Sequence, residues 1–152
     1  MSDEKILELK SNPSVIAYLT FLQDNITRMN SNSSNVKALV AVIYTIFVTV
    51  LCAVDKISLY WYFGIIIIVL GVLLDSYYLG LEKMYRTKFN NFVNDLNNGN
   101  IDVKKIYDMK PKNTNIKSEV LAELLSSMFS FSVLGFYLMI VAISVLLVFI
   151  GR

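Results

Sequence analysis

The sequence contains no histidine and a single cysteine, Cys52, which lies within an apolar run. Disulfide frameworks need paired cysteines and zinc sites need clusters of cysteine and histidine, so both classes of site are excluded. Nucleophilic centres of the Ser/His/Asp or Cys/His type would lack their usual proton acceptor. Phosphate-binding loops of the GxxxxGK[ST] or GxGxxG form do not occur either. These absences argue against an enzyme, and we expect neither a metal nor a cofactor.

Apolar residues, in contrast, are abundant. Of 152 residues, 55% are hydrophobic and the mean hydropathy is +0.55, which is too apolar for a soluble domain of this size. We therefore predict an all-α integral membrane protein with three transmembrane helices, each long enough to cross a hydrocarbon core of about 30 Å. The expected parts are a cytosolic N-terminal helix (1–36), a transmembrane hairpin (37–80), a cytosolic helical region (81–117), and an amphipathic start leading into the third transmembrane helix (118–152).

The second apolar run continues into a helix that leaves the membrane. No proline or glycine pair interrupts the chain after Gly80, and apolar residues recur at helical spacing as far as the stop signal Asn97, Asn98 and Gly99. We predict one continuous helix over 59–97, roughly 60 Å long at about 1.5 Å per residue. Such a helix begins in the membrane and ends in water.

The N-terminal segment predicts a further helix. Asn12 and Pro13 are typical of a helix start, with an N-cap followed by proline in the first turn. A membrane-surface helix is one interpretation, but the polar face carries few charges, and packing against another helix is favoured. The run NSNSSN at 30–35 is expected to end this helix. Its apolar stripe comprises Val15, Leu19, Leu22, Ile26 and Met29.

The basic residues predict the orientation. Four precede the first apolar run and eight lie between the second and third, whereas one lies in the turn at 55–58 and one is Arg152. Lysine and arginine accumulate in cytoplasmic loops of membrane proteins. Twelve basic residues against two therefore place the N-terminus in the cytoplasm and the C-terminus outside.

One face of the second helix combines glycines with charges. Glycines let a neighbouring helix approach closely, and a charge at membrane depth is costly unless it is paired. We expect Arg28 to pair with Glu82 or Asp75 and so hold a closed state; a surface pair between Arg86 and Glu82 is the plainer interpretation. Intervals of seven, four, seven and four residues bring to this face Gly64, Gly71, Asp75, Glu82 and Arg86.

Small residues also recur in the third apolar run, at Ser130, Ser132 and Gly135. Together with Gly64 and Gly71 they form stripes that suit either close helix packing or the lining of a narrow pore. The sequence leaves both interpretations open.

The cytosolic region between the second and third spans is basic and contains aromatic residues. Basic side chains near aromatic rings suit phosphates and stacked bases, which suggests a nucleotide or short oligonucleotide ligand. The positive-inside bias accounts for the same excess of charge without any ligand. The candidate ligand-binding residues are Lys83, Tyr85, Lys104, Lys105, Tyr107, Lys110 and Lys112.

Two segments resemble small bacterial membrane effectors. The segment at 19–37 has a helix ending in I-x-R-M before an N/S-rich turn, and the segment at 73–92 contains D-x-Y-Y-L-x-x-E-x-x-[FY]-R. This layout is similar to SLATT-type two-span effectors and to Hailong-type membrane effectors encoded beside nucleotidyltransferases in anti-phage systems. A third span departs from the simple two-span layout. The matching residues are Ile26, Arg28, Met29, Asn32, Ser33, Asp75, Tyr77, Tyr78, Leu79, Glu82, Tyr85 and Arg86.

The resemblance implies a pore or ion channel of the bacterial inner membrane that acts in antiviral defence. A nucleotide or short oligonucleotide made by a partner nucleotidyltransferase would gate it, and membrane lipid would surround it. Three helices are too few to enclose a water-filled path, so we expect a homo-oligomer, with a tetramer as the working number. A non-conducting membrane anchor or scaffold for a cytosolic partner is the main alternative, and a holin-like permeabilising protein is another.

Overall fold

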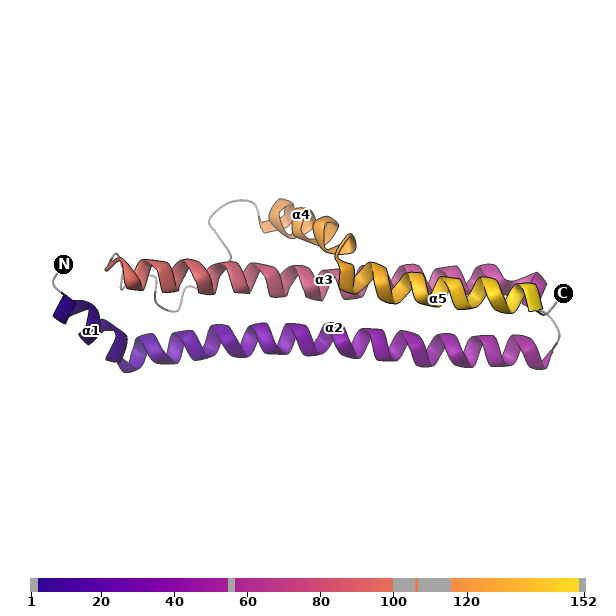
Figure 1. The fold of residues 1–152 in the computed structure, drawn as a ribbon, viewed down its shortest axis with the longest axis horizontal. Helices are drawn as coiled ribbons and strands as arrows, with labels where there is room; N and C mark the ends of the chain where they lie inside the picture. The colour runs from indigo at the N-terminus through magenta and orange to yellow at the C-terminus, as the bar shows by residue number, and fades with distance from the viewer. Residues whose placement is uncertain (1–2, 55–56, 100–105, 107–115, 151–152) are drawn as a thin grey trace.

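Two long antiparallel helices run the length of the molecule (Figure 1). The computed structural model describes residues 3–54, 57–99, 106 and 116–150, and in it α2 (Pro13–Ala53) and α3 (Ile57–Asn97) contain 41 residues each. At about 1.5 Å per residue each helix is roughly 60 Å long, about twice the hydrocarbon thickness of a bilayer. The continuous second helix predicted over 59–97 is confirmed.

Three shorter helices complete the described part of the chain. α1 (Asp3–Ser11) precedes α2, and α4 (Ile116–Met128) lies obliquely beside the middle of α3. α5 (Phe131–Ile150) then runs beside the half of α3 that is nearer the α2–α3 turn (Figure 1). That half is therefore a three-helix bundle, whereas α2 and α3 pair with each other in the other half.

The start of α2 follows the predicted signals, but its continuation does not. Asn12 caps the helix, because its side-chain oxygen accepts a hydrogen bond from the Ser14 backbone N–H at 2.9 Å, and Pro13 occupies the first turn. The helix does not end at 30–35, as the run of asparagine and serine had predicted, but continues to Ala53. Helix propensity is weak and packing overrides it. Here Ser33, in the middle of that run, is buried against α3 and hydrogen-bonded to Asp75.

The predicted end of α3 is confirmed by a left-handed glycine. Gly99 has a φ of 70°, and its N–H donates to the Leu96 carbonyl oxygen at 3.3 Å. Positive φ is cheap only for a residue without a side chain, so the sequence NNG is an effective helix stop.

The last helix is broken rather than continuous. α4 and α5 meet at a bend of 52° around Phe129 and Ser130, so the third apolar helix begins at Phe131 and does not continue straight from the amphipathic start. The Ser130 N–H donates to the Ser127 carbonyl oxygen at 3.0 Å, and Ser130 then accepts from the Val133 N–H at 3.0 Å. These local bonds close one helix and open the next.

All the regular elements in the described ranges are helices, and the long ones are apolar. Two helices, α2 and α3, are long and apolar enough to cross a membrane, or three if the bent α4–α5 pair makes one span. Their outer surfaces carry large exposed apolar side chains, for example Ile46, Ile66, Leu138 and Leu146. An apolar surface of this extent is compatible with a location in lipid.

The described core has two parts. In the three-helix half, Val40 of α2 packs with Val133, Tyr137 and Ile140 of α5. In the other half, Val15, Tyr18 and Leu22 are buried along α2, and the Tyr18 ring meets Phe92 of α3 edge-on at 4.9 Å between centroids. The predicted packing of the N-terminal helix against another helix is thus confirmed, although Leu19, Ile26 and Met29 are only half-buried.

Candidate functional site

A buried ion pair lies where α2 and α3 pass from their apolar to their polar halves. Asp75 of α3 directly follows the apolar run 59–74, and Lys37 of α2 directly precedes the run 38–54. The Lys37 ammonium group lies 2.9 Å from each carboxylate oxygen of Asp75 and donates a hydrogen bond to Oδ1. The Ser33 hydroxyl, one turn before Lys37, also donates to Oδ1, and Lys37 donates to Ser33 Oγ at 3.0 Å. Three side chains from two helices form one closed network.

The two charges differ in their access to solvent. The side chain of Asp75 is 0% exposed, whereas that of Lys37 retains 17%. A buried carboxylate loses several kcal/mol of hydration, so Asp75 depends on the donors that α2 supplies. Sliding α2 along α3 by one turn would remove both donors at once. The network therefore couples the charge of Asp75 to the register of the two long helices.

Three further hydroxyl groups are buried around the same level. They belong to Ser76 of α3, Ser127 near the end of α4, and Tyr137 of α5. The Tyr137 hydroxyl interacts electrostatically with the Asp75 carboxylate. Within the described ranges none of these hydroxyls has a hydrogen-bond partner. A buried polar group without a partner costs about 1–3 kcal/mol, and water or a ligand commonly satisfies it. The site therefore holds unused hydrogen-bonding capacity on the α4–α5 side.

Two glycines allow the other helices to close around Asp75. A Cβ atom at Gly71, one turn before Asp75, would lie 2.7 Å from Val40 Cγ2 and 3.0 Å from the Tyr137 hydroxyl. At Gly80 it would lie 3.3 Å from the Leu124 backbone nitrogen of α4. Only glycine permits such contacts without displacement of the neighbours. Gly71 and Gly80 thus position α5 and α4 on either side of the ion pair.

A second ion pair lies further along α3. The Arg86 guanidinium donates to Glu82 Oε1 at 2.6 Å across one helical turn. Glu82 is buried, but the Arg86 side chain is 61% exposed, so solvent screens this contact and its contribution is small. The predicted pairing of Arg86 with Glu82 is therefore observed, although Glu82 is buried and not at the surface.

Arg28 does not make the contact expected of it. Its guanidinium donates to Asn25 Oδ1 at 2.7 Å, on its own helix, while Asp75 is held by Lys37 and Glu82 by Arg86. The expected pairing with Asp75 or Glu82 is wrong because Arg28 lies on the exposed side of α2. Lys37, two to three turns later, faces α3 instead.

The small residues predicted for packing or pore lining fall into two groups. Gly64 lies against α2, where an added Cβ would be 3.1 Å from the rings of Tyr44 and Phe47. Gly135 and Ser132 of α5 are exposed, with nothing within 4 Å of a Cβ at Gly135, and Ser130 lies at the α4–α5 bend. Gly64 and Gly71 thus serve contacts inside one chain, whereas the α5 stripe faces outward.

The candidate ligand-binding residues are only partly placed. Lys83 and Tyr85 are half-buried on the polar half of α3. Lys104, Lys105, Tyr107, Lys110 and Lys112 lie outside the described residues. In the part of the chain that is described, no cluster of three or more His, Cys, Asp or Glu side chains could hold a metal ion.

Comparison of the chain with protein-family models, with curated proteins and with solved structures found no match.

Sequence reasoning identified Asp75 but missed the residues around it. From the sequence, Lys37 contributes only to the excess of basic residues that predicts the orientation. Ser33 lies in the run at 30–35 that is predicted to end the helix. Their spacing of four residues was a usable signal, because it places a donor pair on one helix face. The buried hydroxyls of Ser76, Ser127 and Tyr137 gave no comparable signal, since serine and tyrosine are ordinary in apolar helices.

Proposed function

We propose that this chain is an oligomeric pore or ion-channel effector of bacterial antiviral immunity. It would depolarise or disrupt the inner membrane when a cytosolic nucleotide or short oligonucleotide, made by a partner nucleotidyltransferase, gates it. The observation that carries this proposal is the buried Lys37–Asp75 pair at the level where α2 and α3 leave their apolar halves. Ionisable residues buried at such a level mark functional elements by default.

The residues behind the resemblance to SLATT-type and Hailong-type effectors support the biological setting. Ser33 and Asp75 belong to that pattern and hydrogen-bond to each other across α2 and α3. Glu82 and Arg86 also belong to it and form the second ion pair. Within the pattern, Ser33 and Asp75 therefore join the two long helices, whereas Glu82 and Arg86 pair within α3.

The free surface of the apolar helices supports assembly. Only 11% of the most apolar window of α2 and 28% of that of α3 are buried within the chain. The rest is available to lipid and to other copies. A single copy places its three apolar helices against one another, so a water-filled path requires several copies arranged around an axis. The outward stripe of Ser132 and Gly135 on α5 is a suitable surface for that contact.

The long helices supply a route from a cytosolic signal to the membrane. α2 and α3 are continuous through the level of the ion pair, so a rotation or shift imposed on their polar halves reaches the apolar halves directly. A ligand shifts such an equilibrium only when it binds the two states with different affinity. The Lys37–Asp75 contact belongs to one of these states, the closed one, and breaking it favours the other.

Ion flux from liposomes that contain the purified protein tests the function. We expect a leak that short oligonucleotides or cyclic nucleotides switch on or off, and a raised basal leak in Lys37→Met because the closed register loses its contact. Lys10→Met, which removes an exposed lysine of α1, is the matched control and should keep the wild-type leak.

Vesicles that stay tight under every condition, with protein shown to be folded and oligomeric, would contradict the pore. That result would favour the non-conducting anchor or scaffold, and the search would turn to the cytosolic protein that it holds. A leak that is independent of any added ligand would favour a holin-like permeabilising protein.

A further inference from the structure

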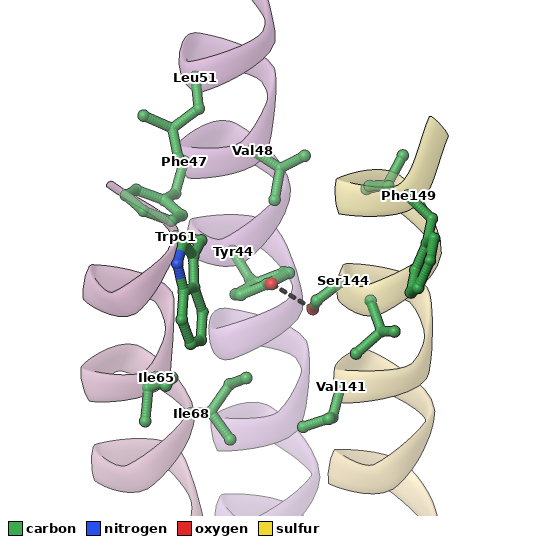
Figure 2. A pocket seen from close by; sticks show the side chains of 12 residues that line it. Tyr44, Phe47, Val48, Leu51, Trp61, Ile65, Ile68, Val141, Ser144 and Phe149 are labelled. Atoms are coloured by element: carbon green, nitrogen blue, oxygen red, sulfur yellow. Dashed lines mark hydrogen bonds between the residues drawn. The ribbon is translucent and has the colours of Figure 1, made fainter. Parts of the chain in front are cut away.

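A cavity of about 320 Å³ lies between α2, α3 and α5, at the end of the bundle next to the α2–α3 turn (Figure 2). Its walls include Phe47 and Val48 of α2, Trp61 and Ile65 of α3, and Val141 of α5. The volume is at the lower end of the roughly 300–1,000 Å³ typical of ligand pockets. It is about twice the ~150 Å³ apolar cavity that admits a benzene-sized guest.

The two hydroxyl groups in this cavity are already engaged in hydrogen bonds. Tyr44 and Ser144 hydrogen-bond to each other across it, as Figure 2 shows, and Ser144 also donates to the Ile140 carbonyl oxygen at 2.6 Å. The serine proton is thus used by the carbonyl, and the tyrosine proton by the serine oxygen. None of the twelve described lining residues carries a charge. Apart from the Trp61 indole N–H, an ion or a polar headgroup would find no polar partner here, whereas a hydrocarbon chain needs none.

We propose that this cavity binds one acyl chain of a membrane lipid, drawn from the leaflet next to the α2–α3 turn. Leu51, Trp61 and Phe149 lie close to the ends of α2, α3 and α5 at that turn, so the cavity is within reach of a lipid in that leaflet. Twelve lining residues are fewer than the roughly 20–30 per side of a stable protein interface, which argues against a second copy as the occupant. The site is independent of the proposed pore function.

An acyl chain would complete the packing of α5. At its other end α5 is fixed by Val133 and Tyr137, which pack with Val40 of α2. Around the cavity its side chains lack partners on one side, and an empty space forfeits their dispersion contacts. A hydrocarbon chain restores these contacts and joins α5 to α2 and α3. The lipid is therefore expected to stabilise the three-helix half of the molecule.

Trp61 offers a direct measurement because it is the single tryptophan of the sequence and lines the cavity. Purified protein in detergent is titrated with phosphatidylcholine that carries brominated acyl chains, which quench tryptophan fluorescence on contact. We expect saturable quenching at one lipid per chain. Trp61 is 52% exposed, so a shallow, unsaturable decrease from lipid in the micelle forms the baseline in every variant.

Val48→Phe fills the cavity from α2, and Val141→Phe fills it independently from α5. Val50→Phe is the matched control, since Val50 is exposed two residues further on and does not line the cavity. We expect both filling variants to need at least tenfold more lipid for half-maximal quenching and the control to match the wild type. Circular dichroism identifies any variant that fails to fold. If one filling variant fails to fold, lipid quenching in the other filling variant tests the proposal. Equal quenching in all folded variants, or no saturable phase in the wild type, would overturn the proposal.

Discussion

Asp75 is the most completely buried charged side chain among the described residues. Its carboxylate has no exposed surface, and its described donors come from one turn of a different helix, Ser33 and Lys37. Removal of one partner of a buried pair costs far more than removal of both, because a single ion is then left without hydration or a counter-charge. The same argument does not apply to Glu82, whose partner Arg86 is largely in solvent.

This asymmetry gives a stability prediction. Lys37→Met should lower the free energy of unfolding by about 3 kcal/mol, because it leaves the Asp75 carboxylate buried and unpaired. The double variant Lys37→Met/Asp75→Leu should recover most of that loss, since no charge then remains in the site. Denaturant titration in detergent micelles, followed by circular dichroism, measures both values.

Arg86→Met is the control for a charge removed from the solvent-exposed side of a pair, and it should change the free energy of unfolding by about 0.5 kcal/mol or less. A loss in Lys37→Met no larger than in Arg86→Met would contradict the buried network. A double variant as unstable as the single would contradict the explanation by an uncompensated charge.

Among the helices, α2 differs most from its sequence-based prediction. Asparagine and serine compete for backbone hydrogen bonds and commonly end helices. In α2 the same run carries Ser33 into contact with Asp75, and Val36 and Val40 follow it into the core. Tertiary contacts on one face of a helix outweigh the modest propensity penalties spread over six residues.

A proline substitution at position 34 tests whether residues 30–35 form a continuous helix or a turn. Ser34 is exposed, so Ser34→Pro changes no buried contact directly, but it removes a backbone hydrogen bond and clashes with the preceding turn. We expect a loss of about 3 kcal/mol in the free energy of unfolding, whereas Ser34→Ala should be neutral or slightly stabilising. Thermal or denaturant unfolding in micelles provides the comparison. Equal stability of the two variants would indicate that residues 30–35 form a turn, as their composition alone predicts.

The α4–α5 bend shows a second difference at the level of elements. Composition alone predicted one helix from the amphipathic start into the third apolar run. The structure separates the two by 52°, which lets α4 lie against Gly80 while α5 packs at Gly71. A straight helix could not reach both glycines with the same geometry. The bend therefore allows both α4 and α5 to enclose the Asp75 site.

On the scale of the whole molecule, the chain is a rod with two chemically different halves. The half near the α2–α3 turn contains three helices (Figure 1). Their outer surfaces are apolar, whereas the other half carries the exposed polar residues of α2 and α3. Buried side chains hold both halves together, and the ion pair lies between them. This arrangement places a charged contact at the one level where a shift of the long helices changes both halves.

Cysteine labelling tests the orientation that the basic residues predict. In a Cys52→Ser background, Val54→Cys lies next to the α2–α3 turn and Asp24→Cys lies on the exposed face of the polar half. A membrane-impermeant maleimide applied to intact spheroplasts should label position 54, and position 24 only after permeabilisation. The reverse pattern would place the N-terminus outside and remove the cytosolic signal from the proposed function.

The sequence by itself determined that the chain is all-helical and that its most costly buried charge lies at Asp75. Apolar runs and helical periodicity are local properties, so an all-helical chain with long apolar helices, the start of α2 at Asn12 and the end of α3 at Gly99 were all predictable. Tertiary structure decided the partner of Asp75, the continuity of α2 through residues 30–35, and the bend before Phe131. Each of these depends on which faces of distant helices meet, and burial against a neighbour then outweighs the local preference of the residues involved.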